Sequence, residues 1–176
     1  MIYFFCRFEY KFSDMYISSK EMPSHSRVWV YQANRPLTDA EVEQINVKTQ
    51  TFVDTWTAHK AALRASFEVR YNQFLLLLID EKQAMASGCS IDSSVHFVKA
   101  LEKEMNLSFF DRLTLAYWAD GILKLVSKDE FEKRMEKGEI NEDTIVFNNL
   151  VQSKIDLDTK WEGPLKNSWH KALLEV

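Results

Sequence analysis

Cys89 is the residue of this sequence best suited to chemistry. It lies in the run Ser87-Gly-Cys-Ser-Ile-Asp92, just before a segment whose apolar spacing predicts a helix. The free amides and positive dipole end at the start of a helix stabilise a thiolate, the reactive form of cysteine. Cys89 could therefore act as a nucleophile or a redox sensor. The alternative, which we favour from sequence, is a small buried cysteine packed under the loop after Gly88.

Two histidines and an acid could accompany Cys89. His59 or His96 could act as the adjacent base, whereas the nearby Asp92 would oppose a thiolate. Six residues separate Cys89 from His96, which matches no zinc-ligand spacing, so we expect no metal. A Ser-His-Asp set can be assembled, but no nucleophile elbow supports it. Its members would be Ser87, Ser90, His59 and Asp92.

A second candidate is the aliphatic run from Leu75 to Ile79 that ends in Asp80 and Glu81. A buried strand ending in two acids looks like the Walker B strand of an ATPase. Such an enzyme also needs a glycine-rich loop ending in Gly-Lys-Ser or Gly-Lys-Thr, because backbone amides and the lysine hold the phosphates. None of the four glycines supplies one. We therefore expect no ATP hydrolysis, and interpret the two acids as polar residues at the edge of a sheet.

Composition excludes several classes of function. The 176 residues fit one domain, and 46% of them are hydrophobic, enough for a core. A formal net charge of -4 provides no global positive field, so we expect no nucleic-acid partner. The apolar start is too soon interrupted by charges for membrane insertion. Two distant cysteines suit a reducing compartment, so we expect a cytoplasmic protein.

The first residues differ in character from the rest of the chain. An aromatic opening is followed by polar residues, and we expect residues 1–26 to form an N-terminal extension. This extension is either disordered or, in large part, not translated, because Met15 and Met22 are start sites alternative to Met1. The remaining residues, 27–176, are predicted to form a single globular domain.

Local patterns predict the elements that would position these residues. Thr38 and Glu41 form a capping box, so a helix should start there, and its apolar stripe ends near His59. Ser90 or Asp92 should cap the second helix. Strands are expected at 27–32, 67–71, 74–79, 113–118, 122–126 and 144–147, a third helix at 128–137, and a turn-and-helix tail at 151–174.

The resulting order is β-α-β-β-α-β-β-α-β, with several hairpins. This order predicts an α+β two-layer sandwich, in which helices cover one face of a mainly antiparallel sheet. Its first part has the order of a ferredoxin-like fold. The run 74–79 is apolar at every position, which is typical of a central strand buried on both faces.

Several short motifs are spread over most of the chain, at 28–32, 56–59, 71–74, 86–92, 94–97, 144–150 and 168–170. Together they resemble a family of short, uncharacterised bacterial proteins that often carry the label "ABC transporter ATPase". The resemblance spans roughly residues 27–173 and leaves out the first 26. The label implies ATP binding, but the resemblance carries no established substrate, cofactor or catalytic residue to this chain.

The leading hypothesis is a small binding or interaction module without ATPase activity or cofactor, whose partner is a protein or a small molecule. One alternative is a thiol-based enzyme or redox protein that uses Cys89, with His59 or His96 as base. The other is an ATP-binding protein, as the family label suggests. The expected ligand or partner surface consists of Asp80, Glu81, Ser87, Gly88, Ser90, Trp169 and His170.

Overall fold

Strand β5 (Phe74–Ile79) is the centre of the first sheet. In the computed structural model, which describes residues 17–82 and 84–175, all six of its residues are buried. It pairs antiparallel with β1 (Arg27–Gln32) on one edge and with β4 (Ala65–Arg70) on the other. The prediction of a strand buried on both faces is confirmed.

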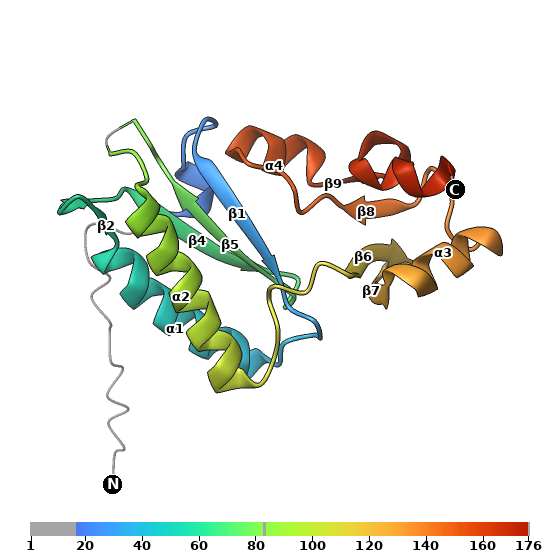
Figure 1. Cartoon of the computed structure of the whole chain (residues 1–176), viewed down its shortest axis with the longest axis horizontal. Coiled ribbons are helices and arrows are strands. Elements are labelled where there is room, and N and C mark those ends of the chain that lie inside the picture. The colour runs from blue at the N-terminus through green and yellow to red at the C-terminus, as the bar shows by residue number, and fades with distance from the viewer. Residues whose placement is uncertain (1–16, 83, 176) are drawn as a thin grey trace, which may run out of the picture.

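Two long helices cover one face of this sheet, α1 (Asp39–Thr55) and α2 (Gly88–Met105), as Figure 1 shows. Side chains alternate between faces along a strand, so every second residue of β5 meets the helices. The resulting core joins Leu75, Leu77 and Ile79 to apolar residues of α1 and α2 such as Ile45 and Leu101. The predicted capping box of Thr38 and Glu41 starts α1.

The C-terminal part of the chain, residues 114–175, covers the opposite face. Phe74, Leu76 and Leu78 pack there against Phe147 and Trp161. A four-stranded antiparallel sheet in this part has the order β7-β6-β8-β9. Its elements are β6 (Thr114–Ala119), β7 (Ile122–Ser127), α3 (Lys128–Glu136), β8 (Ile145–Phe147), α4 (Lys154–Lys160), β9 (Glu162–Pro164), η2 (Leu165–Asn167) and η3 (Trp169–Glu175).

The α+β class is confirmed, and the strands are divided between separate sheets. The order β1-β5-β4 is the one that the first three strands of a ferredoxin-like fold adopt. The strand after α2, β6, does not join them but pairs with β7 and β8. The physical reason is the second apolar face of β5, which needs a cover that helices on one side cannot provide.

A short segment of the C-terminal part protects the outer edge of β1. The amide of Val28 donates to the carbonyl of Gln152, and that of Lys154 donates to the carbonyl of Ser26. Arg27 and Ser153 form an isolated antiparallel bridge. The start of α4 therefore lies beside the first residues of β1.

The described part of the expected N-terminal extension packs against the domain. Met22 is buried in the core between the two parts, and Ser66 Oγ donates to the carbonyl of Ile17 at 2.6 Å. Ser19, which begins the short helix η1 (Ser19–Glu21), donates through its hydroxyl to Glu68. The boundary expected at residue 27 thus falls inside the folded part, and residues 1–16 lie outside the described residues.

None of the helices that the described residues form has the length and apolar character needed to span a bilayer.

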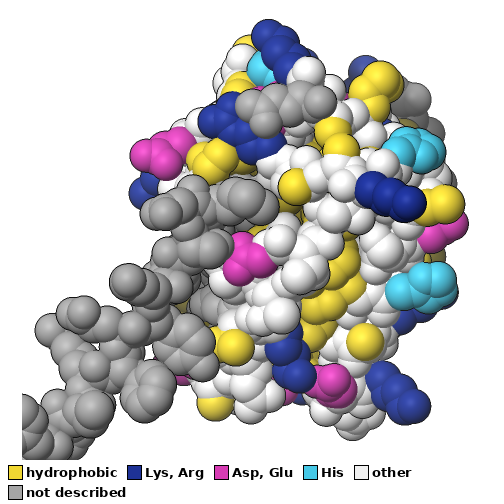
Figure 2. Space-filling view, turned by 90° about the vertical axis from the view of Figure 1, so that its left-hand side faces the viewer, with side chains coloured by type: hydrophobic (Ala, Val, Ile, Leu, Met, Phe, Trp, Pro, Cys, Tyr) yellow, Lys and Arg dark blue, Asp and Glu magenta, His cyan; other side chains and the backbone are white. Residues whose placement is uncertain are grey.

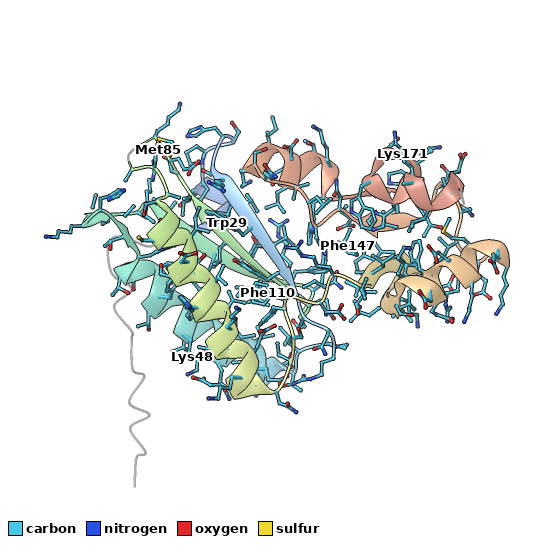
Figure 3. The ribbon with its side chains drawn as sticks, in the orientation of Figure 1. Trp29, Lys48, Met85, Phe110, Phe147 and Lys171 are labelled. Atoms are coloured by element: carbon cyan, nitrogen blue, oxygen red, sulfur yellow. The ribbon has the colours of Figure 1, made fainter. Side chains whose placement is uncertain are left out.

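Phe147 tests the packing between the two parts. Its ring is 2% exposed and lies 4.8 Å from that of Phe74 and 5.1 Å from that of Trp161, at the boundary that Figure 3 shows. Phe147→Ala should lower the free energy of unfolding by about 3–5 kcal/mol in a urea titration, because it leaves a cavity. Leu150→Ala, at an exposed position, should change it by less than ~0.5 kcal/mol. Equal effects of the two variants would contradict this packing.

Candidate functional site

A hollow lies where the C-terminal end of α1 meets the N-terminal end of α2. Its volume is about 550 Å³. The residues that line it come from three segments that are distant in sequence: the end of α1, the hairpin after it and the first turns of α2. They are Phe52, Thr55, Trp56, Thr57, His59, Ser87, Cys89, Ser90 and Ser93.

The start of α2 brings Cys89 to this hollow. Ser87 is the N-cap, and its hydroxyl accepts from the amide of Ser90 while the hydroxyl of Ser90 accepts from the amide of Ser87. The helix therefore starts earlier than expected, and neither Ser90 nor Asp92 is its N-cap. Cys89 lies inside the first turn and is exposed. The favoured prediction of a buried cysteine is wrong, because the first turn directs this position to solvent.

A short hairpin brings His59 to the same hollow. Helix α1 ends at Thr55, earlier than expected, and the strands β2 (Thr57–Ala58) and β3 (Ala61–Ala62) follow. His59 and Lys60 form the turn between them, with φ of 50° and 69°. Two consecutive left-handed residues define a tight hairpin turn, which usually carries Asn or Gly. Because His59 and Lys60 stand where Asn and Gly are usual, the sequence did not predict this turn.

Trp56 fixes the floor of the hollow, a role that sequence reasoning missed. Its side chain is 3% exposed, and its indole Nε1 donates to the carbonyl of Ser90 at 2.9 Å. Phe52 lies 5.0 Å from Trp56 and stacks on Phe97 at 4.4 Å. These contacts hold the end of α1 against the first turn of α2. Figure 2 views this end of the molecule and shows a strip of hydrophobic side chains between polar ones.

The other residues proposed to accompany Cys89 do not line the hollow. His96 is exposed on α2, and at seven residues from Cys89 it lies about 10 Å further along the helix. Asp92 is also exposed and is not one of the residues that line the hollow. Within 17–82 and 84–175, no group of three or more His, Cys, Asp or Glu residues could hold a metal ion. Cys89 and His59 therefore share the lining of one hollow, and His96 lies outside that lining.

Asp80 is not at the surface but 3% exposed, and it ties three segments together. His25 Nε2 lies 2.9 Å from its Oδ1, Arg64 Nη1 donates to its Oδ2 at 3.1 Å, and the amide of Lys82 also donates to Oδ1. The bond from His25, together with Arg64, holds the pKa of Asp80 below its usual range. Sequence reasoning missed His25 because it lies in the expected extension.

Glu81 is half-buried and also has internal partners. It accepts from Arg27 at 3.5 Å and from the amide of Ala86 at 3.2 Å. Both acids that resembled a Walker B strand thus bind groups of the protein itself. Gly88 is exposed beside Cys89 but does not line the hollow.

Trp169 and His170, near the C-terminal end of the described residues, differ in burial. Trp169 is 39% exposed, whereas His170 is 1% exposed and stacks on it with the ring centroids 3.9 Å apart. The Nδ1 atom of His170 lies 2.9 Å from the hydroxyl of Ser168. Burial lowers the pKa of His170 to about 4. Only Trp169 of this pair is available to a partner.

Comparison with family models, with curated proteins and with solved structures finds no match to this chain. The arrangement of the site itself therefore carries the functional argument. It combines an exposed thiol, an imidazole and several hydroxyls over an aromatic floor, which can bind a small molecule or present the thiol to one.

His170 should make the protein less stable as pH falls from 6.5 towards 4. Its pKa is about 4 in the folded chain and 6.5 when unperturbed, so in this range the unfolded chain binds more protons. The full effect is roughly 3 kcal/mol in the free energy of unfolding. Urea titrations at several pH values should show this slope, and His170→Phe should reduce it. His96→Phe, at an exposed position, should leave the slope unchanged; a slope that persists in His170→Phe would contradict the assignment.

Asp80→Asn should destabilise the protein by about 2–3 kcal/mol, because it removes the charge that both His25 and Arg64 face. The contribution of Asp80 is present above its unfolded pKa and is lost as pH falls through the lowered pKa of the folded state. The measurement is chemical denaturation at neutral pH. Asp92→Asn is the exposed control and should be neutral; equal costs would show that Asp80 does not tie the three segments.

Proposed function

We propose that this protein is a small binding module whose ligand site is the hollow between α1 and α2. One observation carries the proposal: three distant segments converge on a single hollow whose lining contains no Asp, Glu, Lys or Arg among the described residues. Its volume of about 550 Å³ lies in the range of small-molecule sites.

The lining favours an uncharged ligand with an apolar face. Phe52, which is half-buried, offers apolar surface above the buried indole of Trp56. Thr55, Thr57 and Ser93 also line the hollow, and the hydroxyls of Thr55 and Ser93 donate to carbonyls of their own helices and can still accept. Sites of this kind gain affinity from apolar burial and orientation from a few polar groups. A charged ligand would lose hydration without gaining an ion pair from the lining.

ATP hydrolysis is not part of the proposed function. The chain has no glycine-rich phosphate loop, and Asp80 and Glu81 are engaged by His25, Arg64 and Arg27. The sequence therefore lacks the loop amides and the lysine that would bind a triphosphate, and the ATPase label finds no support in it. A cytoplasmic location also belongs to the proposal, and the free, exposed thiol of Cys89 supports it.

Blocking the hollow tests the binding proposal. Ser93→Phe places a ring in the lining, whereas Ala100→Phe places one on the exposed surface of the same helix. A screen of uncharged aromatic fragments by ligand-observed NMR should find compounds that bind the wild-type chain and Ala100→Phe but not Ser93→Phe. Fragments that bind all three proteins equally would overturn the proposal.

A second candidate function is thiol chemistry with Cys89 as nucleophile and His59 as base. The observation that favours it is that an exposed thiol in the first turn of a helix shares the hollow with an imidazole. The base would take the thiol proton, and the helix start would stabilise the thiolate. His96 is excluded from this role by its position outside the hollow.

Alkylation rates separate the two candidate functions. In a Cys6→Ser background, we expect iodoacetamide to modify Cys89 at neutral pH, and His59→Asn to slow the reaction by about tenfold. Asparagine suits the left-handed turn, so the hairpin should persist in this variant. His96→Asn is the matched control and should react like the wild-type chain. Equal alkylation rates in all three proteins would show that His59 is not a base for Cys89. Only the first proposal, the binding module, would then remain.

A further inference from the structure

Tyr71 occupies a turn that its residue type disfavours. It joins β4 to β5 together with Asn72 and Gln73, and Tyr71 and Asn72 have φ of 56° and 47°. This tight turn usually carries Asn, Asp or Gly, and a bulky aromatic residue in the left-handed region is strained. Tyr71 is nevertheless 50% exposed, so burial alone does not account for a tyrosine here. Strained residues of this kind concentrate at functional sites.

Four residues of the C-terminal part contact the Tyr71 side chain. The rings of Phe147 and Trp161 lie 5.9 Å and 6.1 Å from that of Tyr71, and Glu162 and Trp118 complete the set. Its hydroxyl donates to Glu162 Oε2 at 2.8 Å, and Trp118 Nε1 donates to Glu162 Oε1 at 3.0 Å. The rings of Tyr71 and Trp118 lie 5.3 Å apart at 85° to each other. The turn after β4, strand β6 and strand β9 thus hold two aromatic rings and one carboxylate in a fixed arrangement.

Within 17–82 and 84–175, no Lys, Arg or His lies at ion-pair distance from the carboxylate of Glu162. Both of its hydrogen-bond partners are neutral donors. Arg70, next to Tyr71, is engaged elsewhere: it donates to Glu68 at 2.6 Å and lies over the ring of Trp161. Glu162 is exposed, and each oxygen of a carboxylate can accept more than one hydrogen bond.

We propose that Tyr71, Trp118 and Glu162 form a binding site for an organic cation, an ammonium or guanidinium group. Aromatic faces attract such cations through the ring quadrupole, and a fixed carboxylate adds direct attraction. A guanidinium is more weakly hydrated than a compact ammonium, and quaternary ammonium groups bind aromatic cages, so both suit contact with aromatic faces. The cation belongs to a small molecule or to a lysine or arginine of a partner. This site is separate from the hollow and does not rest on the proposed function.

The test uses the indole signal of Trp118 in the full chain. In ¹⁵N-labelled protein, Trp118→Phe identifies the Nε1–H resonance of Trp118. Tetramethylammonium chloride represents a small quaternary ammonium ligand, and N-acetylarginine amide represents a partner side chain. Either probe should shift this resonance saturably at millimolar concentration, beyond the shift that equal sodium chloride causes. The probe that binds more tightly identifies the source of the cation.

Two variants complete the test. Glu162→Gln removes the charge but keeps one acceptor oxygen for Trp118 Nε1, while its NH2 can donate to the hydroxyl of Tyr71. It should weaken binding by about tenfold or more. Tyr71→Asn relieves the strained turn, so it should fold, yet it should abolish the saturable shift. Glu142→Gln, which removes an exposed charge elsewhere, should bind like the wild-type chain. The proposal is overturned if neither probe shifts Trp118 beyond the salt control, or if Glu162→Gln and Tyr71→Asn bind normally.

Discussion

The double burial of β5 is the constraint on which the rest of the structure depends. Its residues are apolar at every position and have no exposed surface, so each face of the strand needs its own cover. Helices α1 and α2 provide one cover, and the C-terminal part provides the other through Phe147 and Trp161. The division of the remaining strands into a second sheet follows from this need, since one layer cannot bury two faces.

The same constraint separates the polar groups of the molecule into distinct places. Asp80 directly follows the apolar strand, and its buried carboxylate binds His25 and Arg64. The role of Asp80 is therefore structural. The hollow with Cys89 and His59 forms on the helical side, where two helix ends meet. The cluster of Tyr71 and Glu162 forms at the turn between β4 and β5, at the other end of β5 from Asp80, and it contacts the C-terminal part. Each place therefore has its own chemistry.

Local signals in the sequence were sufficient for much of the fold and for little of the site. Apolar runs and caps identified β1, β5, the start of α1 and α3, because these depend on neighbouring residues. The strands expected at 67–71 and 74–79 implied a break between them, but no Gly or Asn-Gly signal indicated the left-handed conformation of Tyr71 or the hairpin at His59. The contact between His25 and Asp80 spans 55 residues, and no spacing rule reaches that far. The exposure of Cys89 likewise depends on where α2 begins, which Ser87 decides through a capping box of two serines.

The edge of β1 connects this architecture to the order in which the chain is synthesised. Strands β1, β4 and β5 are complete once residue 79 has been made, but the partner of the outer edge of β1, around Gln152 and Ser153, comes more than seventy residues later. Until then the backbone groups of Ser26 and Val28 at this edge lack their later partners, and such edges template pairing with other chains. A growing or prematurely ended chain is thus exposed to aggregation over this interval, and the segment before α4 acts as an internal guard against it.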